Sequence, residues 1–240
     1  MSKALVYSGQ GSQYVGMLSD IYEKYPMAKD LINHADEVVG FKLSKICFNG
    51  PIDVLKETRY TQPAIYLHSA VIYSLIKEKI EFDYTAGHSV GEYAALFASG
   101  VIGFEDGLKL VAKRGELMFN AGLDKPGTMF AVINLDDDKL VEVCRQLTEN
   151  GNGNVVVPAN FNSPGQIVVS GSADYLRENI SAFKAAGARM TKELVVSGAF
   201  HSPLMEAAKN ELAAAIDKTN FMDTTKPVFS NVYAKPLSQA

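Results

Sequence analysis

Short apolar runs alternate with longer helix-like stretches along this chain, and this alternation constrains the fold more than any other feature. Ala4–Tyr7 is an apolar run that ends at the glycine-rich segment Ser8–Gln13, and Phe82–Ala86 is a second run that ends at Gly87. The polar-rich stretch Ile21–Val39 has the character of one helix. Because alternating strands and helices are typical of α/β proteins, the sequence predicts an α/β fold.

The spacing of strand-like and helix-like stretches changes near Pro126. Between residues 126 and 192, strand-like runs and two helix-like stretches follow one another closely, which indicates a small α+β lobe inserted in the larger fold. We therefore predict a catalytic domain of residues 1–125 and 193–240, with residues 126–192 as the lobe. A helix over Ser202–Lys218 resumes the larger domain, with Ser202 as its N-cap and Pro203 at its first position.

The composition excludes several classes of protein. Of the 240 residues, 47% are hydrophobic and 21% are charged, as in ordinary globular domains, which excludes disorder, collagen-like repeats and a coiled coil. The formal net charge of −4 provides no general attraction to nucleic acid or to an anionic membrane, so we expect neither as a partner. An anionic ligand must therefore be bound by local cations.

Cysteine usage and hydropathy together indicate a cytoplasmic protein. Cys47 and Cys144 form neither a CxxC pair nor a disulfide framework, which favours a reducing compartment. No apolar run reaches the ~18 residues that a membrane span needs. The start of the chain reads as a first strand, Ala4–Tyr7, and not as a signal peptide.

Residues 87 to 91 match the pattern G-x-S-x-G, with Ser89 at the centre. The segment lies between a strand-like run and a helix-like stretch, where flanking glycines allow a sharp turn that exposes a serine hydroxyl at its apex. The N-terminus of the following helix would supply backbone N–H groups to a developing oxyanion. This context favours a nucleophilic serine, and the alternative is an ordinary turn serine.

A serine nucleophile needs a neighbouring base, usually a histidine. His34 and His68 lie in helix-like stretches, which favours structural roles for both. His88 is adjacent to Ser89, so stabilisation of the turn is its better interpretation. His201 follows a strand-like segment and precedes a helix, where open α/β folds place their ligand sites. We predict His201 as the base, and the alternative is an exposed loop histidine.

The helix predicted from Phe104, which we expect to end at Gly122, carries one charged residue on its apolar side. At ~100° per residue the other charged residues share one narrow arc, whereas Arg114 falls among leucine, valine and methionine side chains. An unpaired buried charge is costly, so Arg114 needs an anionic partner or a polar cavity. Its planar fork suits a carboxylate. Periodicity alone favours an internal salt bridge and a ligand role equally.

Five short motifs follow one another over nearly the whole chain: Gly9–Gln13, Gly87–Glu92, Arg114–Met118, Ala159–Gln166 and Gly198–Ser202. Together they resemble those of the malonyl-CoA:acyl-carrier-protein transacylases and the related acyltransferase domains of fatty acid and polyketide synthases. The resemblance implies a hydrolase-like parallel-sheet α/β core with an inserted ferredoxin-like lobe. It also implies malonyl-CoA and acyl carrier protein as partners, and no cofactor beyond the coenzyme A thioester that serves as substrate.

The resemblance further implies the catalytic roles. Ser89 would take the malonyl group as an ester in a ping-pong reaction. His201 would activate Ser89 as a base and later act as an acid for the leaving thiol. Gln10 and the backbone N–H of Val90 would form the oxyanion hole.

Four more residues are implied in substrate binding. Arg114 would bind the free carboxylate of the malonyl group. Phe200 is similar to the residue that fills the space a 2-methyl branch would need, which favours malonyl over methylmalonyl. Asn160 and Gln166, both in the fourth motif, complete the implied set.

The end of the sequence departs from the family pattern. Family members continue past Ala234 with further helices, and that region includes a glutamine whose backbone carbonyl is thought to orient the catalytic histidine. We therefore expect either that a C-terminal part of the protein is missing here or that His201 is oriented in another way.

Two other functions stay open at this point. A serine esterase or thioesterase would share Ser89 and His201 but would have no need of Arg114. A catalytically silent module that binds acyl carrier protein is the second alternative. A candidate docking patch for the carrier consists of Lys184, Arg189 and Lys192, with a solvated face as the alternative. Fatty acid and polyketide synthesis are equally compatible with the motifs.

Overall fold

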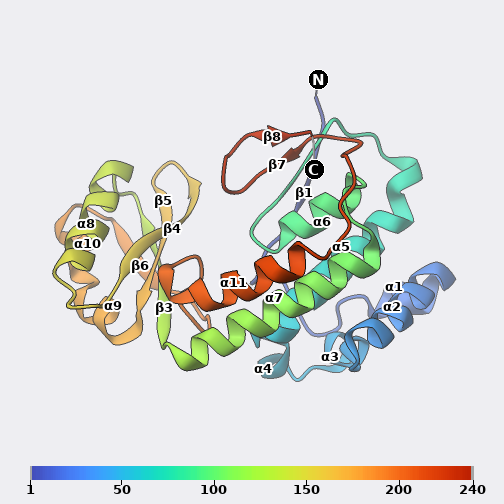
Figure 1. Cartoon of the computed structure of the whole chain (residues 1–240), viewed down its shortest axis with the longest axis horizontal. Helices are drawn as coiled ribbons and strands as arrows, with labels where there is room; N and C mark the ends of the chain where they lie inside the picture. The colour runs from blue at the N-terminus through green and yellow to red at the C-terminus, as the bar shows by residue number, and fades with distance from the viewer. Residues whose placement is uncertain (1, 239–240) are drawn as a thin grey trace. The chain divides into compact units, whose positions relative to one another are not determined.

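The computed structural model describes residues 2–238, and their contacts divide the chain into two compact units (Figure 1). The first unit consists of residues 1–116 and 212–240, and the second of residues 117–211. One boundary falls within the helix α7 (Phe104–Asp124) and the other within α11 (Glu206–Ile216). The architecture is mixed α/β with a parallel sheet, so the predicted fold class is confirmed at this level. The lobe limits at 126 and 192 stay a prediction.

The sheet of the first unit has the strand order β1-β2-β7-β8. Strands β1 (Ala4–Tyr7), β2 (Tyr84–Gly87) and β7 (Val228–Phe229) are parallel, and β8 (Pro236–Leu237) is antiparallel to β7. Tyr7 pairs with Gly87 in the register, so β1 and β2 end at the same level. The segments that follow the parallel strands therefore meet at one edge of the sheet, where open α/β folds carry their ligand sites.

Helices pack around this sheet and form the main core. The core consists of buried side chains from several helices, such as Tyr66 of α5, Ala94 of α6 and Leu108 of α7. No helix within residues 2–238 is both long and apolar enough to cross a membrane. Besides α7, the helices of this unit are α1 (Ser19–Lys24), α2 (Pro26–Val39), α3 (Leu43–Asn49), α4 (Ile52–Leu55), α5 (Thr58–Ile76) and α6 (Gly91–Ala98).

Two sequence-based expectations about helices were wrong. The stretch Ile21–Val39 is not one helix, because the chain is extended at Tyr25, with φ −122° and ψ 112°, before Pro26 starts α2. A residue that precedes proline disfavours the helical conformation. Helix α7 also continues past Gly122, where an added Cβ would lie 2.1 Å from the carbonyl oxygen of Ser197. Gly122 therefore permits a close backbone approach and does not end the helix.

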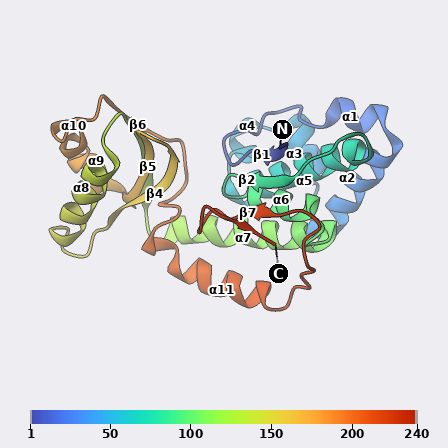
Figure 2. The ribbon, with the colours of Figure 1, turned by 90° about the horizontal axis from the view of Figure 1, so that it is seen from above.

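The second unit contains a four-stranded antiparallel sheet in the order β4-β5-β3-β6. Its strands are β3 (Gly127–Ile133), β4 (Val156–Ser163), β5 (Gln166–Ser172) and β6 (Met190–Glu193), and its helices are α8 (Asp137–Glu149), α9 (Ala173–Asn179) and α10 (Ser181–Ala185). Figure 2 shows the three helices on the same side of this sheet. Between them lies a separate apolar core that includes Phe130 and Val132 of β3, Leu176 of α9 and Phe183 of α10.

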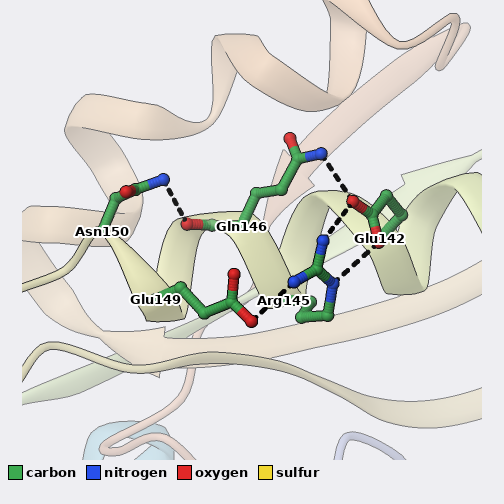
Figure 3. A network of polar contacts seen from close by, with 5 residues as sticks. All are labelled: Glu142, Arg145, Gln146, Glu149 and Asn150. Carbon is green, nitrogen blue, oxygen red and sulfur yellow. Dashed lines mark hydrogen bonds and ion pairs between the residues drawn. The ribbon is translucent and has the colours of Figure 1, made fainter.

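The exposed face of α8 carries a network of charged side chains (Figure 3). Arg145 donates two hydrogen bonds to Glu142, of 2.6 and 2.8 Å, and one of 2.6 Å to Glu149. Gln146 adds a hydrogen bond of 2.6 Å to Glu142. These donors, Arg145 first, lower the pKa of the Glu142 carboxyl to about 2.

The start of the last helical segment agrees with its sequence. The Oγ of Ser202 accepts a 3.3 Å hydrogen bond from the backbone N–H of Leu204, so the predicted N-cap is confirmed. Pro203 opens a single 3₁₀ turn, Pro203–Met205, which leads into α11. The same Ser202 Oγ donates a 2.6 Å hydrogen bond to the carbonyl oxygen of Ala199. This contact holds the loop that carries His201.

Candidate active site

Ser89 lies at the apex of a sharp turn between β2 and α6. Its φ of 51° is in the left-handed region, which non-glycine residues rarely occupy. An added Cβ at Gly87 would lie 2.0 Å from the carbonyl oxygen of Gly91, and one at Gly91 would lie 2.6 Å from that of Tyr7. The two glycines of the motif are thus required because backbone packs directly on backbone on both sides of the serine.

The guanidinium of Arg114 contacts the hydroxyl of Ser89. Its Nη2 donates a 3.0 Å hydrogen bond to Ser89 Oγ, and its Nη1 donates one of 2.6 Å to Gln62 Oε1. Within residues 2–238 these hydrogen bonds reach a hydroxyl and a neutral amide, and no carboxylate accepts one from Arg114. The internal salt bridge that periodicity allowed is therefore not formed with any carboxylate in this described part of the chain.

Burial and aromatic contact define the electrostatics around Arg114. Burial lowers the pKa of the Arg114 guanidinium, and the nearby Tyr93 and Glu92 oppose this shift. The Cζ of Arg114 lies 5.9 Å from the centroid of the Tyr93 ring, a cation–π distance. Gln62 is 1% exposed, so its side chain has little freedom to turn away. The site thus holds a desolvated cation whose hydrogen-bond partners carry no charge.

Gln10 and Val90 lie on two segments that border the turn. The Nε2 of Gln10, in the loop after β1, donates a 3.2 Å hydrogen bond to Oγ1 of Thr58, the first residue of α5. Val90 precedes the first residue of α6, so its N–H belongs to the groups at a helix N-terminus that have no acceptor within the helix. A role of both in an oxyanion hole stays a prediction.

The remaining predicted site residues belong to the second unit. His201 is exposed in the loop before the Pro203 turn, with a left-handed φ of 58°. Phe200 is 5% exposed. Asn160 of β4 is half-buried and pairs with Val168, while Gln166 begins β5. Their predicted roles as base and substrate-binding residues stay predictions.

The other three histidines occupy different surroundings. His34 is exposed on α2, with Nε2 3.4 Å from a carboxylate oxygen of Glu105. His68 is half-buried on α5, where burial lowers its pKa. His88 packs against the loop after β1, since an added Cβ at Gly9 would lie 2.6 Å from its Nδ1. Residues 2–238 contain no group of three or more His, Cys, Asp or Glu side chains able to hold a metal ion.

Comparison with known proteins identifies the family. Residues 4–240 match the model of the acyl transferase domain. The chain is 42% identical over 241 residues to the malonyl CoA-acyl carrier protein transacylase of Bacillus subtilis, covering all of this chain and 75% of that protein. The chain belongs to the malonyl CoA-acyl carrier protein transacylase family. The resemblance recognised from the five motifs is therefore confirmed.

Solved structures agree with this assignment. The MCAT of Streptococcus pneumoniae is 41% identical, with a TM-score of 0.90, over 98% of this family member and 76% of that chain. A second is a malonyl-transacylase in complex with a type II PKS acyl-carrier protein, with a TM-score of 0.91 and 36% identity over 100% of this chain and 77% of that one. Both share the fold of this acyltransferase over at least 98% of its length.

Sequence reasoning missed two side chains at the centre of this acyltransferase's site. Gln62 is a glutamine within the apolar part of α5, and that isolated polar position is a signal that could have identified it. Asn231 follows β7, and its side chain forms hydrogen bonds with the backbone of Gly87 and Ser89 in the nucleophile turn. Its position after a short strand carries no local signal, because the contact spans more than half the chain.

Proposed function

We propose that this chain transfers a malonyl group from coenzyme A to the phosphopantetheine thiol of an acyl carrier protein, through an ester on Ser89. The observation that carries the proposal is the 3.0 Å hydrogen bond from Arg114 Nη2 to Ser89 Oγ. It brings a guanidinium within reach of any acyl group that this oxygen bears. A malonyl ester ends in a carboxylate, which a guanidinium binds through two parallel hydrogen bonds. An acetyl ester offers no such partner.

In the first half-reaction, Ser89 Oγ attacks the thioester carbonyl of malonyl-CoA and His201 takes its proton. Gln10 and the N–H of Val90 donate hydrogen bonds to the resulting oxyanion. Such donors contribute most where negative charge develops in the transition state. Collapse of the intermediate breaks the carbon–sulfur bond. His201 returns the proton to the leaving sulfur, so free coenzyme A departs and the malonyl ester remains.

In the second half-reaction, the phosphopantetheine thiol of the carrier attacks the ester. Its proton passes to His201 and then to Ser89 Oγ as the ester bond breaks, which regenerates the hydroxyl. Arg114 holds the malonyl carboxylate throughout, and Phe200 limits the space beside the 2-carbon. Asn160 and Gln166 complete the proposed substrate contacts. The reaction needs no cofactor beyond the thioester itself.

The substrates are supported by the relatives. The Bacillus subtilis protein bears the name malonyl CoA-acyl carrier protein transacylase, and the malonyl-transacylase described above was solved with its acyl-carrier protein. Both match this chain over its entire length. An esterase would share the nucleophile, but it would have no need of a desolvated cation beside Ser89 Oγ.

We propose that the core is hydrolase-like and that the inserted lobe is ferredoxin-like. The parallel strands β1, β2 and β7 and the nucleophile turn after β2 support the first part. The succession β3, α8, β4, β5, α9 with α10, and β6, on one antiparallel sheet, supports the second.

We also propose that the protein acts in the cytoplasm. Cys47 and Cys144 are both free thiols and both buried. Free cysteines are typical of proteins in reducing compartments.

Intact-mass measurement tests the proposed function. The protein is mixed with malonyl-CoA, its mass is recorded, and holo acyl carrier protein is then added. We expect the mass of one malonyl group to be added at Ser89 and to pass to the carrier. Ser89→Ala should acquire no adduct, whereas Ser181→Ala, which changes an exposed serine of α10, should behave as wild type.

The other outcomes separate the alternative functions. An adduct that water discharges as fast as the carrier does would identify a thioesterase. The absence of any adduct, together with tight carrier binding, would identify a silent docking module. Either outcome would overturn the proposed transfer.

A further inference from the structure

The side chain of Asn231 connects Gly87, where the nucleophile turn begins, with Ser89 at its apex. Its Oδ1 accepts a 2.7 Å hydrogen bond from the backbone N–H of Ser89, and its Nδ2 donates one of 2.7 Å to the carbonyl oxygen of Gly87. Because the N–H can only donate and the carbonyl can only accept, the orientation of the amide is determined by its partners. One planar group therefore fixes the backbone at two points, the carbonyl of Gly87 and the N–H of Ser89.

The segment that carries Asn231 is held by strand pairing and by hydrogen bonds. Strand β7 runs parallel to β2, with Val228 opposite Thr85 and Phe229 opposite Ala86, so the chain after β7 arrives beside the turn. Ser230, the residue between β7 and Asn231, is 8% exposed. Its Oγ accepts hydrogen bonds of 3.2 and 3.4 Å from the backbone N–H groups of Val232 and Tyr233. The ladder between β2 and β7 ends at Phe229, and the Asn231 amide continues it beyond the point where backbone can pair.

The turn needs such an external restraint. A left-handed residue other than glycine stores unfavourable backbone energy, and it persists only where the surroundings determine it. Ser89 has φ 51°, and its N–H is one of the two groups that Asn231 binds. A rotation of the backbone at Ser89 would move the Oγ away from Arg114 and would break the hydrogen bond to Asn231 at the same time.

Asn231 also connects the turn with a half-buried carboxylate, that of Glu92. Its backbone N–H donates a 3.1 Å hydrogen bond to Glu92 Oε1. Burial raises the pKa of Glu92, while this hydrogen bond and the charge of Arg114 lower it. A neutral side chain at position 231 satisfies the two backbone groups without a further charge beside Glu92 and the hydroxyl of Ser89.

We propose that Asn231 is a positioning residue, whose amide holds the strained turn so that the Ser89 hydroxyl stays in its reactive orientation. The inference rests on the proposed function in one respect, namely that Ser89 is the nucleophile. Asn231 acts through the backbone of Ser89 and contacts no substrate atom in this role. Its contribution is therefore to the acylation rate and not to recognition of the malonyl carboxylate.

The test uses a probe that needs no recognition of a malonyl group. Methanesulfonyl fluoride transfers its sulfonyl group to a nucleophilic serine with loss of fluoride, and intact-mass spectrometry gives the rate constant at Ser89. We expect Asn231→Ala to lower this rate constant by about tenfold or more, the consequence of losing hydrogen bonds to groups that must stay ordered. The KM for malonyl-CoA should change little while kcat falls.

A second variant keeps the proposal testable if Asn231→Ala folds poorly. In Asn231→Asp, the ionised carboxylate cannot donate to Gly87, but the protonated acid can donate and accept as the amide does. The negative charge of Glu92 raises the pKa of such an acid. We expect the rate of this variant relative to wild type to recover by about tenfold as the pH falls from about 8 to about 5.

Glu92, Arg114 and His88 lie beside the turn in both proteins, so the ratio to wild type removes the pH dependence that the two proteins share. A loss of stability alone would not produce this recovery. The matched control is Asn154→Asp in the second unit. The Nδ2 of Asn154 also donates to a glycine carbonyl, that of Gly151, at 3.0 Å. Its relative rate should stay constant with pH.

The failures are distinguishable. Wild-type labelling at Ser89 with equally fast labelling of Asn231→Ala would overturn the positioning role alone, as would a pH-independent ratio for Asn231→Asp. No labelling of Ser89 in the wild type would overturn the nucleophile and, with it, both the proposed function and this inference.

Discussion

Arg114 donates a hydrogen bond of 3.0 Å from Nη2 to the Oγ of Ser89. The guanidinium cannot drift from this position, because Nη1 is bound at 2.6 Å to the buried amide of Gln62. When the Oγ becomes an ester oxygen it is a poorer hydrogen-bond acceptor, so Nη2 is then free to bind the acyl group. The same residue would thus hold the hydroxyl before acylation and the malonyl carboxylate after it.

Replacement of Arg114 should remove the preference for malonyl. We expect Arg114→Ala to lower kcat/KM for malonyl-CoA by about 100-fold, the loss of two charge-assisted hydrogen bonds, while some acetyl transfer persists. The kcat/KM of Arg114→Lys should be intermediate, because lysine keeps the positive charge but lacks the planar guanidinium that forms two parallel hydrogen bonds. Arg177→Ala, at an exposed arginine paired with Asp174 and Glu193, is the control. Undiminished malonyl selectivity in Arg114→Ala would refute the carboxylate role.

Gln62 should act through Arg114. In Gln62→Leu the Nη1 loses its acceptor, and we expect the KM for malonyl-CoA to rise by about tenfold, with little change for acetyl-CoA. Gln62→Glu should be worse, because a buried carboxylate would bind the guanidinium bidentately and compete with the malonyl group. Steady-state kinetics with both thioesters measures the effect. Equal losses for malonyl and acetyl would show that Gln62 only supports the fold.

Gly91 should tolerate no side chain. An alanine Cβ would lie 2.6 Å from the carbonyl oxygen of Tyr7 and 2.7 Å from that of Ser8, and backbone cannot move aside as a side chain can. We expect Gly91→Ala to lower the free energy of unfolding by about 1–3 kcal/mol, as in other overpacked sites, and to slow acylation. Urea unfolding measures the first effect. The control is Gly103→Ala, where an added Cβ meets nothing within 4 Å.

The carboxyl of Glu142 should titrate at about pH 2 in the folded protein. Arg145→Gln should raise this pKa toward the ordinary value of about 4.3, and Gln146→Ala should raise it less, because Arg145 is the larger cause. Carbon-13 NMR of the side chain measures the pKa directly.

The lowered pKa of Glu142 determines how its contribution to stability changes with pH. Because the folded-state pKa is lower than the unfolded one, the stabilisation is complete above about pH 4.3 and is lost as the pH falls toward 2. Arg145→Gln should therefore have its effect on stability near neutral pH and none in strong acid. An effect that persists below pH 2 would contradict this assignment.

Local patterns predicted several elements correctly. Ser202 caps the turn before α11 as its pattern predicts, because caps depend on a few adjacent residues. Local patterns failed where a neighbouring segment imposed the conformation. The sequence pattern predicts that the helix ends at Gly122, but this glycine instead permits the close approach of the Ser197 backbone. A contact with a segment so far along the chain cannot be predicted from the helix pattern.

Three features follow from local patterns along the chain: the family, the glycine-flanked turn around Ser89, and the position of Arg114 on the apolar side of its helix. Each of these depends on backbone geometry and periodicity within a few residues. Which groups meet depends on the packing of the folded chain: Arg114 contacts Gln62, 52 residues away, and Ser89 contacts Asn231, 142 residues away. The spacing of apolar residues along a helix or strand indicates which of its sides is buried. The partner of a buried polar group depends instead on how distant strands and helices pack.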